Sequence, residues 1–535
     1  MKKIIVFILI FYAYNFVVFA DTGFFFYVQF ADKNNSPFSL DNPAQYLSQR
    51  AIERRIFFEI AVDSTDLPVN PEYVSAVKNV GVKIVGKSRW LNGITVLAKD
   101  SDIIQNIKNL EFVTKVQYTG RRTKQQYISK ISKTTDEPLN YGTSDTQIKQ
   151  IKADFLHNLG YCAQGIHLAV IDGGFLNADK NPAFNSLHLQ NRLLGTSDFT
   201  DSDPNVYAYE YHGANVLSIL TGNLPNKYLG IAPQASFWLL KSEYSMNEYL
   251  VETDFWISAI EFADSAGVDI TTTSLGYRTF DDPSMNFTYS DMNGRVSRAS
   301  IVAEMAAHKG LIVCVSAGND GNGSWRYIGV PADAAGIVTV GSVTATGTPS
   351  TFSSYGPTAD GRVKPELCAL GSGTALVNTA GIPASGDGTS YSAPVIAGAF
   401  ACFLQYAKDN FPTFSLNQIL NAVFESGNTY SSPNSQTGYG IPDFQLAVSN
   451  LNNLLINNIP KFSYKNKIFY NSEKRTLRVD KSIINNENIT LYSIFGKIIF
   501  NKKITSEYIS LQHYNLPAGV YIVQIGSVRE KIVVY

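Results

Sequence analysis

From about residue 145 to residue 450, short apolar runs alternate with amphipathic segments of helical periodicity. In chain order these include a helical stretch at 257–266, an apolar run at 268–270, a helical stretch at 303–308 and an apolar run at 311–315. This alternation predicts an α/β fold in which a mainly parallel, doubly wound sheet is covered by helices on both faces. Reactive groups in such sheets gather outside the carboxyl ends of the strands. Strand ends are therefore the places to search for functional residues.

Two smaller units flank this region, as a chain with room for about three to four domains allows. Residues 24–119 are predicted to form a small α+β domain, with strands at 24–30, 82–85 and 94–98 and helices at 44–55 and 71–80. Residues 463–535 show short alternating segments at 490–494, 498–504, 521–525 and 531–535. The second pattern predicts a small all-β sandwich.

The first twenty residues have the layout of a signal peptide. Lys2 and Lys3 precede an apolar stretch at 4–19, and the small residue Ala20 follows it. A retained membrane anchor is the alternative, but the stretch is short for a span and Asn15 interrupts it. We therefore expect residues 1–20 to be cleaved and the mature chain to be exported.

Two polar segments are predicted to separate the folded units. Residues 120–138 are polar and basic and have almost no apolar periodicity. This segment can be a solvated linker or a cleavable junction, and the two interpretations are compatible. Residues 451–462 are rich in Asn and are interpreted as a second linker.

The overall charge gives no drive toward nucleic acid or acidic lipid. The 44 Lys and Arg residues and 45 Asp and Glu residues give a formal net charge of -1. Four cysteines are too few for a disulfide scaffold in a chain of this length. Cys314 lies in an apolar run and is interpreted as a small core residue.

Among the six histidines, His212 has the sequence context of a general base. Gly213 follows it and would let another backbone approach closely, and a helical stretch begins just after. His167 lies inside a strand-like run and His308 lies near a helix end, so both are interpreted as structural.

Asp172 directly follows the apolar run 168–171, at the carboxyl end of a predicted buried strand. A carboxylate in that position is costly to desolvate unless it is paired. A histidine partner would satisfy the charge and fix the tautomer of the ring. A turn-capping role is an equally good interpretation of the local sequence.

Ser390 is the candidate nucleophile. The tripeptide Gly-Thr-Ser also ends at Ser144 and Ser197, but polar residues follow it there, whereas Ser390 leads into a long small-residue helix at 393–406. A hydroxyl at the amino end of a buried helix gains a favourable dipole for developing negative charge. The motif Gly-x-Ser-x-Gly of another hydrolase fold is absent from the sequence.

Asn319 follows a predicted strand and opens a glycine-rich turn. Its side-chain amide could stabilise an oxyanion. The ordinary alternative is an Asn that tolerates positive φ in a turn.

These residues occur in the order Asp, His, Asn, Ser, each within the local sequence that a subtilisin-like peptidase requires. On this basis the chain resembles the subtilase family of serine peptidases, and the order matches that of subtilisin. Further motifs agree, namely Gly-Ile-Ala-Pro at 230–233, Ser-Leu-Gly at 274–276, Phe-Ser-Ser-Tyr-Gly at 352–356 and Lys-Pro-Glu at 364–366. The resemblance covers about 145–450.

The resemblance implies a subtilisin-like fold and a serine endopeptidase that forms an acyl-enzyme. We expect no metal and no cofactor. The residues that it assigns are the catalytic Asp172, His212 and Ser390, the oxyanion-hole residue Asn319, and the substrate-binding Ser274, Leu275 and Gly276.

Four departures from the family pattern lie close to these positions. Gly173 stands where Ser or Thr is usual, Ala-Asn at 214–215 follows the His-Gly pair, and Tyr-Ser at 391–392 replaces Met-Ala. None of these removes a group that moves a proton or stabilises charge. Ala-Leu-Gly at 369–371 replaces Ala-Pro-Gly, so the resemblance does not predict the backbone conformation of that loop.

The flanking units also resemble known modules. The motif at 47–55, with Ser-Arg-Trp-Leu-Asn at 88–92, is similar to the propeptide of exported bacterial subtilases. Residues 463–535 are similar to the sorting domain that the type IX secretion system reads, and a carbohydrate-binding accessory domain is the competing interpretation. The resulting division is a signal peptide at 1–20, an inhibitory propeptide with its processing linker at 21–138, a peptidase domain at 139–450, a linker at 451–462 and a β-sandwich at 463–535.

The expected partners are protein or peptide substrates, the chain's own propeptide and the type IX secretion machinery, with no nucleic acid and a monomeric state. The expected location is secreted or at the cell surface. The rival function is a surface-binding module that keeps the fold without catalysis. A metallopeptidase is disfavoured because the sequence has no His-Glu-x-x-His, and Asp198, Asp201 and Asp203 are interpreted as a solvated acidic loop rather than a calcium site.

Overall fold

The chain divides into two compact units, Met1–Asn452 and Asn453–Tyr535, and each is described by itself. The computed structural model describes residues 23–122, 141–200, 205–208, 210–244, 247–458, 468–471, 475–480, 487–493, 497–514, 516–517, 519–526 and 528–534. The predicted signal peptide and nearly all of the predicted linker at 120–138 lie outside these residues. Within the described ranges, no helix combines the length and the apolar character that a membrane span requires.

A parallel sheet of seven strands forms the centre of the first unit, in the order β13-β12-β11-β10-β5-β9-β6. The strands are β5 (His167–Asp172), β6 (Leu193–Asp198), β9 (Ser236–Lys241), β10 (Ile270–Thr273), β11 (Ile312–Ser316), β12 (Val338–Val343) and β13 (Leu367–Leu370). The three strands from β11 to β5 are buried almost throughout, because helices cover both faces. The sequence placed one strand at 268–270, but β10 begins only at Ile270, since Val268 still belongs to the turn that ends the preceding helix.

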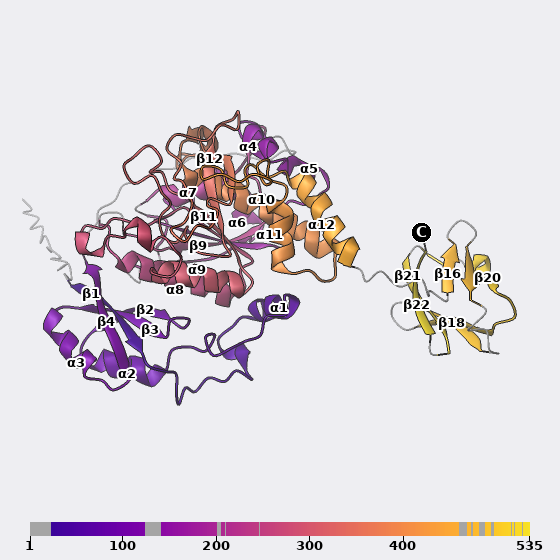
Figure 1. Ribbon diagram of the computed structural model, residues 1–535, viewed down its shortest axis with the longest axis horizontal. Helices are drawn as coiled ribbons and strands as arrows, with labels where there is room; N and C mark the ends of the chain where they lie inside the picture. Colours follow the sequence, from indigo (N-terminus) through magenta and orange to yellow (C-terminus); the bar gives the residue numbers. More distant parts are fainter. Residues whose placement is uncertain are drawn as a thin grey trace, which may run out of the picture. The chain divides into compact units, whose positions relative to one another are not determined.

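Two pairs of helices cover the sheet (Figure 1). Helices α7 (His212–Thr221) and α10 (Thr389–Asn410) pack together, and so do α8 (Val251–Ala266) and α9 (Arg298–His308). The second pair packs on the strands through a core that includes Trp256, Ile260, Val302 and Val313. This arrangement confirms the predicted doubly wound α/β fold, and Cys314 is fully buried in it as expected.

Shorter elements complete the peptidase region. They are α4 (Asp145–Gln150), α5 (Ala153–Asn158), α6 (Asn185–Leu189), α11 (Leu416–Phe424), α12 (Phe444–Asn458), β7 (Asn223–Leu224), β8 (Tyr228–Leu229), β14 (Thr374–Val377) and β15 (Pro383–Gly386). Helix α12 runs through residues 451–458, so that part of the predicted linker is helical, and 459–462 lie outside the described residues.

The N-terminal α+β region is an antiparallel sheet in the order β2-β3-β1-β4, with helices α1 to α3. Its elements are β1 (Phe24–Phe30), α1 (Gln49–Phe57), α2 (Pro71–Asn79), β2 (Lys83–Ser88), β3 (Gly93–Ala98), α3 (Ile104–Lys108) and β4 (Val113–Arg121). The predicted helix at 44–55 is wrong in its first half. Ser48 has an extended backbone and its hydroxyl caps α1 by accepting from Ala51 N at 3.1 Å, so the helix starts only after it.

This N-terminal sheet packs on α8, as Figure 1 shows. Phe25 of β1 makes an edge-on contact with Phe255 of α8 at 5.8 Å between ring centroids. Trp90, in the turn between β2 and β3, is buried in the same apolar core as α8 and α9. The N-terminal region therefore shares a core with the peptidase region.

The second unit is a β-sandwich, as predicted. One sheet has the order β16-β17-β20 and the other β19-β18-β21-β22, and the two enclose an apolar core that includes Leu477, Leu491 and Val523. Its strands are β16 (Ile468–Asn471), β17 (Thr476–Val479), β18 (Asn488–Ser493), β19 (Ile498–Lys503), β20 (Tyr508–Ser510), β21 (Gly519–Ile525) and β22 (Val528–Val534).

Candidate active site

Asp172 and His212 meet at the carboxyl edge of the central sheet. Asp172 is the last residue of β5 and is fully buried, and His212 is the first residue of α7. The Nδ1 atom of His212 lies 2.9 Å from Oδ1 of Asp172. Because an ionised carboxylate can only accept hydrogen bonds, Nδ1 carries the proton and Nε2 is left as the basic nitrogen.

Opposing effects set the protonation of His212. Burial opposes a charge on the ring, but the charge and the hydrogen bond of Asp172 outweigh it. With smaller contributions from Glu243 and Glu210, the pKa rises from 6.5 to about 9. The ring is therefore a strong base, held by a carboxylate with which it shares a proton.

The two extra acids, Glu210 and Glu243, were not singled out in the sequence. Glu210 precedes α7, and its Oε1 accepts from the backbone N–H of Tyr211 at 2.9 Å and of His212 at 3.3 Å. A carboxylate at this position accepts from N–H groups that have no partner within the helix, and the positive amino end of the helix dipole stabilises its charge. In the sequence, the signal for this role is an acidic residue two positions before His212.

Gly213 has the role that its sequence position predicted. A Cβ on this residue would lie 2.5 Å from Gly174 O and 2.8 Å from the Cβ of Asp172. No real side chain tolerates such distances, so a glycine is required where α7 meets the end of β5. The contact that aligns His212 with Asp172 therefore depends on this close approach.

Ser390 lies in the first turn of α10 and is 9% exposed. Its hydroxyl donates to the carbonyl oxygen of Ser274 at 3.3 Å, and the hydroxyl of Ser274 donates to the carbonyl oxygen of Ser390 at 2.7 Å. Tyr391, the next residue, has its ring 5.8 Å from the ring of His212. Packing of α7 against α10 thus brings the histidine beside the helix turn that carries the serine.

Asn319 lies in the turn after β11, with its side chain fixed by Thr389. Its Oδ1 accepts from the backbone N–H of Thr389 at 2.9 Å and from the hydroxyl of Thr389 at 3.0 Å. Asn319 does not have positive φ; Gly318 does, at 103°. The turn-residue alternative is therefore excluded, and the Nδ2 donor is left for another acceptor. Nothing in the local sequence indicates that Thr389 orients the amide.

Two N–H donors border the same space beside Ser390. A Cβ built on Gly388 would lie 3.7 Å from Nδ2 of Asn319 and 3.7 Å from the backbone nitrogen of Ser390. Gly388 has φ of 150°, which only glycine adopts readily. The space that a side chain would fill is therefore open, and both donors border it.

Gly371 resolves the loop that the sequence left open. Its carbonyl oxygen accepts from Gly388 N at 2.8 Å, and its N–H donates to Val343 O at 3.0 Å. A Cβ here would lie 2.1 Å from the Oγ of Ser392. Leu370, which stands where the family usually has Pro, therefore leaves the hydrogen bond from Gly388 N to Gly371 O in place.

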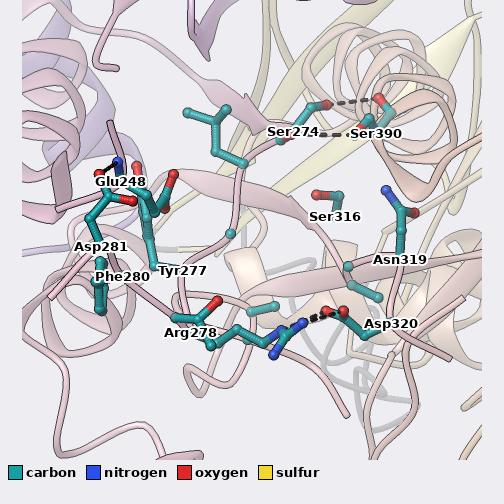
Figure 2. A pocket seen from close by; sticks show the side chains of 17 residues that line it. Glu248, Ser274, Tyr277, Arg278, Phe280, Asp281, Ser316, Asn319, Asp320 and Ser390 are labelled. Carbon is teal, nitrogen blue, oxygen red and sulfur yellow. Dashed lines mark hydrogen bonds and ion pairs between the residues drawn. The ribbon is translucent and has the colours of Figure 1, made fainter. Parts of the chain in front are cut away.

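A cavity of about 480 Å³ opens beside Ser390 (Figure 2). All three predicted substrate-binding residues, Ser274, Leu275 and Gly276, lie on its wall, and so does Asn319. Figure 2 shows Arg278 directed at Asp320 across the lower end, with hydrogen bonds of 3.0 Å from Nε and 2.7 Å from Nη2. The cavity can accept a side chain of a peptide whose backbone passes Ser390.

The far wall of this cavity is acidic. Glu248 and Asp281 lie there, and the N–H of Glu248 donates to Asp281 Oδ2 at 3.4 Å. Burial and then the charge of Asp281 raise the pKa of Glu248 to about 7. Neither carboxylate forms an ion pair with any residue in the described part of the chain.

The acidic loop that was considered for calcium is only partly described. Asp198 is buried and forms an ion pair with Lys241 Nζ at 2.8 Å. Asp201 and Asp203 lie outside the described residues. The expectation of a solvated acidic loop is therefore wrong for Asp198, because its carboxylate is buried and neutralised by a lysine.

A buried carboxylate, an imidazole and a hydroxyl at the edge of a parallel sheet, with two N–H donors beside the hydroxyl, are typical of serine hydrolases. Comparison with family models matches residues 163–440 to the subtilase family, residues 25–137 to the peptidase S8 propeptide domain of Bacteroidota and residues 467–534 to a secretion system C-terminal sorting domain. The chain belongs to the subtilase family. Its sorting domain indicates export through the type IX system, with release or attachment at the cell surface.

The relatives have low sequence identity to this chain. Subtilisin E of Bacillus subtilis (strain 168) is 29% identical over 307 residues, which cover 56% of this chain and 70% of the relative. Subtilisin of Bacillus pumilus is 28% identical over 307 residues, covering 56% of this chain and 97% of the relative. The crystal structure of MycP1 with its N-terminal propeptide removed aligns with a TM-score of 0.43 and 20% identity, covering 57% of this chain and 96% of that one.

Proposed function

We propose that the protein is a secreted serine endopeptidase that hydrolyses peptide bonds through an acyl-enzyme on Ser390. One observation carries the proposal. His212 is bonded to buried Asp172 at 2.9 Å and its ring lies beside Tyr391, which directly follows Ser390. A base with a fixed tautomer next to a serine in a helix turn is the requirement for activating a hydroxyl.

In the proposed reaction, Ser390 is the nucleophile, His212 acts first as base and then as acid, and Asp172 stabilises the charged ring. The hydroxyl of Ser390 leaves the carbonyl of Ser274 and gives its proton to Nε2 of His212 while Oγ attacks the scissile carbonyl carbon. Asp172 stabilises the resulting imidazolium. The imidazolium then protonates the leaving amine, and the C–N bond breaks to leave the acyl-enzyme. In the second half, water gives a proton to His212 and attacks the ester carbonyl, and the imidazolium returns a proton to Oγ of Ser390 as the acid is released.

Negative charge on the tetrahedral oxygen is stabilised by Nδ2 of Asn319 and the backbone N–H of Ser390. Support comes from the space that both donors border at 3.7 Å from the Cβ position of Gly388. Donors fixed before the reaction need no reorganisation as the charge develops. Thr389 holds the amide through its two hydrogen bonds to Oδ1.

An extended substrate segment would lie along 274–276 and form strand-like hydrogen bonds there. This geometry favours unfolded chains and loops as substrates. The propeptide would occupy the same groove until it is cut within 120–138. Packing of Gly120 on Tyr249, the neighbour of the cavity residue Glu248, supports that path, since β4 ends close to the acidic end of the cavity.

Active-site labelling tests the proposal. A fluorophosphonate probe reacts with an activated serine, so the processed protein should be labelled and the Ser390→Ala variant should not. Processing should shorten the wild-type chain within 120–138 and leave Ser390→Ala at full length. A correctly processed, folded wild type that is not labelled would instead support the binding module.

A further inference from the structure

The carboxyl end of helix α8 carries a negative charge for which the described part of the peptidase region supplies no ion-pair partner. The last turn of α8 has no basic residue, and it carries Asp264, which is fully buried. The free carbonyl groups of a helix end already make it electronegative. Asp264 adds a full charge, so this helix end requires cations from elsewhere.

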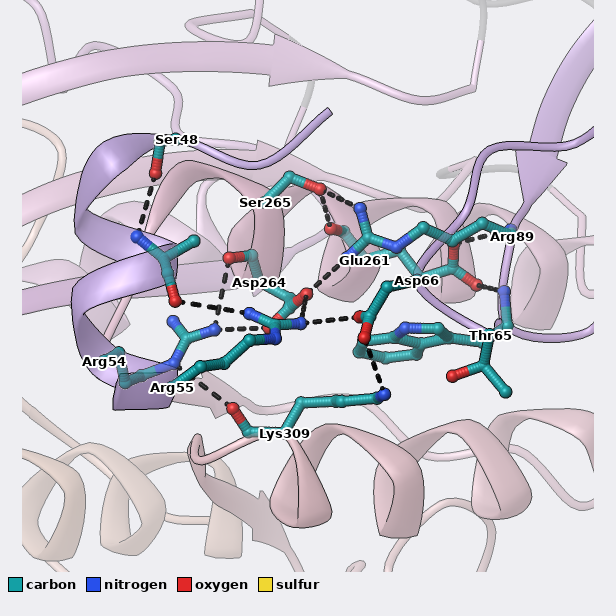
Figure 3. A network of polar contacts seen from close by, with 12 residues as sticks. Ser48, Arg54, Arg55, Thr65, Asp66, Arg89, Glu261, Asp264, Ser265 and Lys309 are labelled. Atoms are coloured by element: carbon teal, nitrogen blue, oxygen red, sulfur yellow. Dashed lines mark hydrogen bonds and ion pairs between the residues drawn. The ribbon is translucent and has the colours of Figure 1, made fainter. Parts of the chain in front are cut away.

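Three arginines of the N-terminal region supply the cations (Figure 3). Arg54 donates to Oδ1 of Asp264, while Arg55, at 2.8 Å, and Arg89 donate to Oδ2. All three guanidinium groups are buried. Burial opposes the charge on Asp264, but the three guanidinium groups together hold its pKa below the ordinary value.

The same region also satisfies the free carbonyl groups around the end of α8. Arg54 donates to the carbonyl oxygens of Asp264, at 3.2 Å, and Val268. Arg50 donates to Gly267 O at 2.9 Å, and the N–H of Ser48 donates to Ser265 O at 2.9 Å. Guanidinium forks suit this task because their N–H groups are fixed in one plane.

Charge complementarity extends around this centre. Glu261, one turn earlier on α8, accepts from the hydroxyl of Ser88 at 2.5 Å and from the N–H of Arg89 at 2.8 Å. Lys309 of the peptidase region contacts Asp66 at 2.9 Å. In every one of these contacts one partner belongs to residues 23–122 and the other to the peptidase region.

We infer that the carboxyl end of α8, with Asp264 at its centre, is a recognition socket for arginines, and that it selects as its partner a propeptide that presents Arg54, Arg55 and Arg89. The inference rests on the proposed function, because the propeptide becomes a separate partner only after the linker is cut. The socket is defined by Asp264, Glu261 and the carbonyl groups of 264–268. Removing the central acceptor takes the shared carboxylate away from three buried guanidinium groups. Arg54 and Arg89 then lose their ion pairs with Asp264 while Arg55 keeps Asp66 at 2.7 Å, and burying unpaired cations is strongly unfavourable.

The test separates recognition from catalysis. A site for an added sequence-specific endoprotease is placed within 123–140 of the full-length Ser390→Ala chain, so that the propeptide is freed without enzyme activity. After the cut, the propeptide should remain with the rest of the chain during gel filtration. In Asp264→Asn, which keeps the shape and loses the charge, the dissociation constant should rise about 100-fold or more.

Two further variants keep the result interpretable. Asp145→Asn removes a charge from an exposed pair with Lys149 on α4 and should leave the dissociation constant within about threefold. Arg55→Gln changes only the propeptide side and should weaken retention like Asp264→Asn, even where the latter folds poorly. It also removes the 2.7 Å pair of Arg55 with Asp66 inside the propeptide, but Lys309 still pairs with Asp66. Unchanged retention in Arg55→Gln, or equal loss in Asp145→Asn, would overturn the inference whether or not the protein is a peptidase.

Discussion

The hydroxyl of Ser274 donates a 2.7 Å hydrogen bond to the carbonyl oxygen of Ser390 and replaces a donor that helix α10 lacks. In an α-helix this oxygen accepts from the N–H four residues later. That residue is Pro394, which has no N–H. One wall of the cavity is thus tied to the helix turn that bears the candidate nucleophile.

Replacing Ser274 by Ala should therefore destabilise the protein. The carbonyl of Ser390 would be buried without a donor, which costs about 1–3 kcal/mol. Urea unfolding in the Ser390→Ala background measures this loss without autolysis. Ser284→Ala, at an exposed hydroxyl that donates a hydrogen bond to Asp282, should change the free energy of unfolding by less than about 0.5 kcal/mol. Equal effects of the two substitutions would contradict the argument.

Asn319→Ala should lower kcat about 10²–10³-fold with little change in KM. This magnitude is the one known for removal of an oxyanion-hole donor in subtilisin, a relative of this chain. Thr389→Val keeps the amide but removes one of the two bonds that orient it, so it should give a smaller loss in the same direction. Steady-state kinetics on a peptide substrate measure both, and a larger loss for Thr389→Val would rule out Asn319 as the donor.

Gly388→Ala should reduce activity more than it reduces stability. The backbone at φ of 150° strains any side chain, at a cost of about 1–3 kcal/mol. In addition, the new Cβ would occupy the space that both proposed oxyanion donors border. Measuring both kcat and the free energy of unfolding distinguishes the two effects. Gly361→Ala is the control, because Gly361 also has positive φ but a Cβ there would meet no atom within 4 Å. The control should lose stability without losing kcat.

The pH dependence of kcat/KM should follow the basic form of His212. Its pKa is raised to about 9, so the ring is protonated and inactive below that value and kcat/KM should rise with pH up to about 9. Glu210→Gln removes one of the charges that raise this pKa, and the rising limb should move to lower pH. Glu425→Gln, at an exposed carboxylate at the end of α11, should leave the limb in place. A limb that stays fixed in Glu210→Gln would contradict the assignment.

Much of the site was predictable because its residues carry local signals. Asp172 ends an apolar run, a glycine follows His212, and a small-residue helix follows Ser390. Thr389 and Glu210 were missed although they are sequence neighbours of predicted residues, since nothing in the local pattern shows toward which group a side chain turns. The helix predicted at 44–55 failed for a similar reason, because the capping hydroxyl of Ser48 overrides the periodicity around it.

The sequence by itself determined the alternating strands and helices, the order of the four candidate residues and the division into modules, since each follows from patterns within a few neighbouring residues. Tertiary structure alone decided that Ser274 supplies the bond that Pro394 cannot, and that Arg54 reaches Asp264, 210 residues away. The physical reason is that a buried polar group must find a partner in space, and the fold, rather than the neighbouring sequence, determines which partner is within reach.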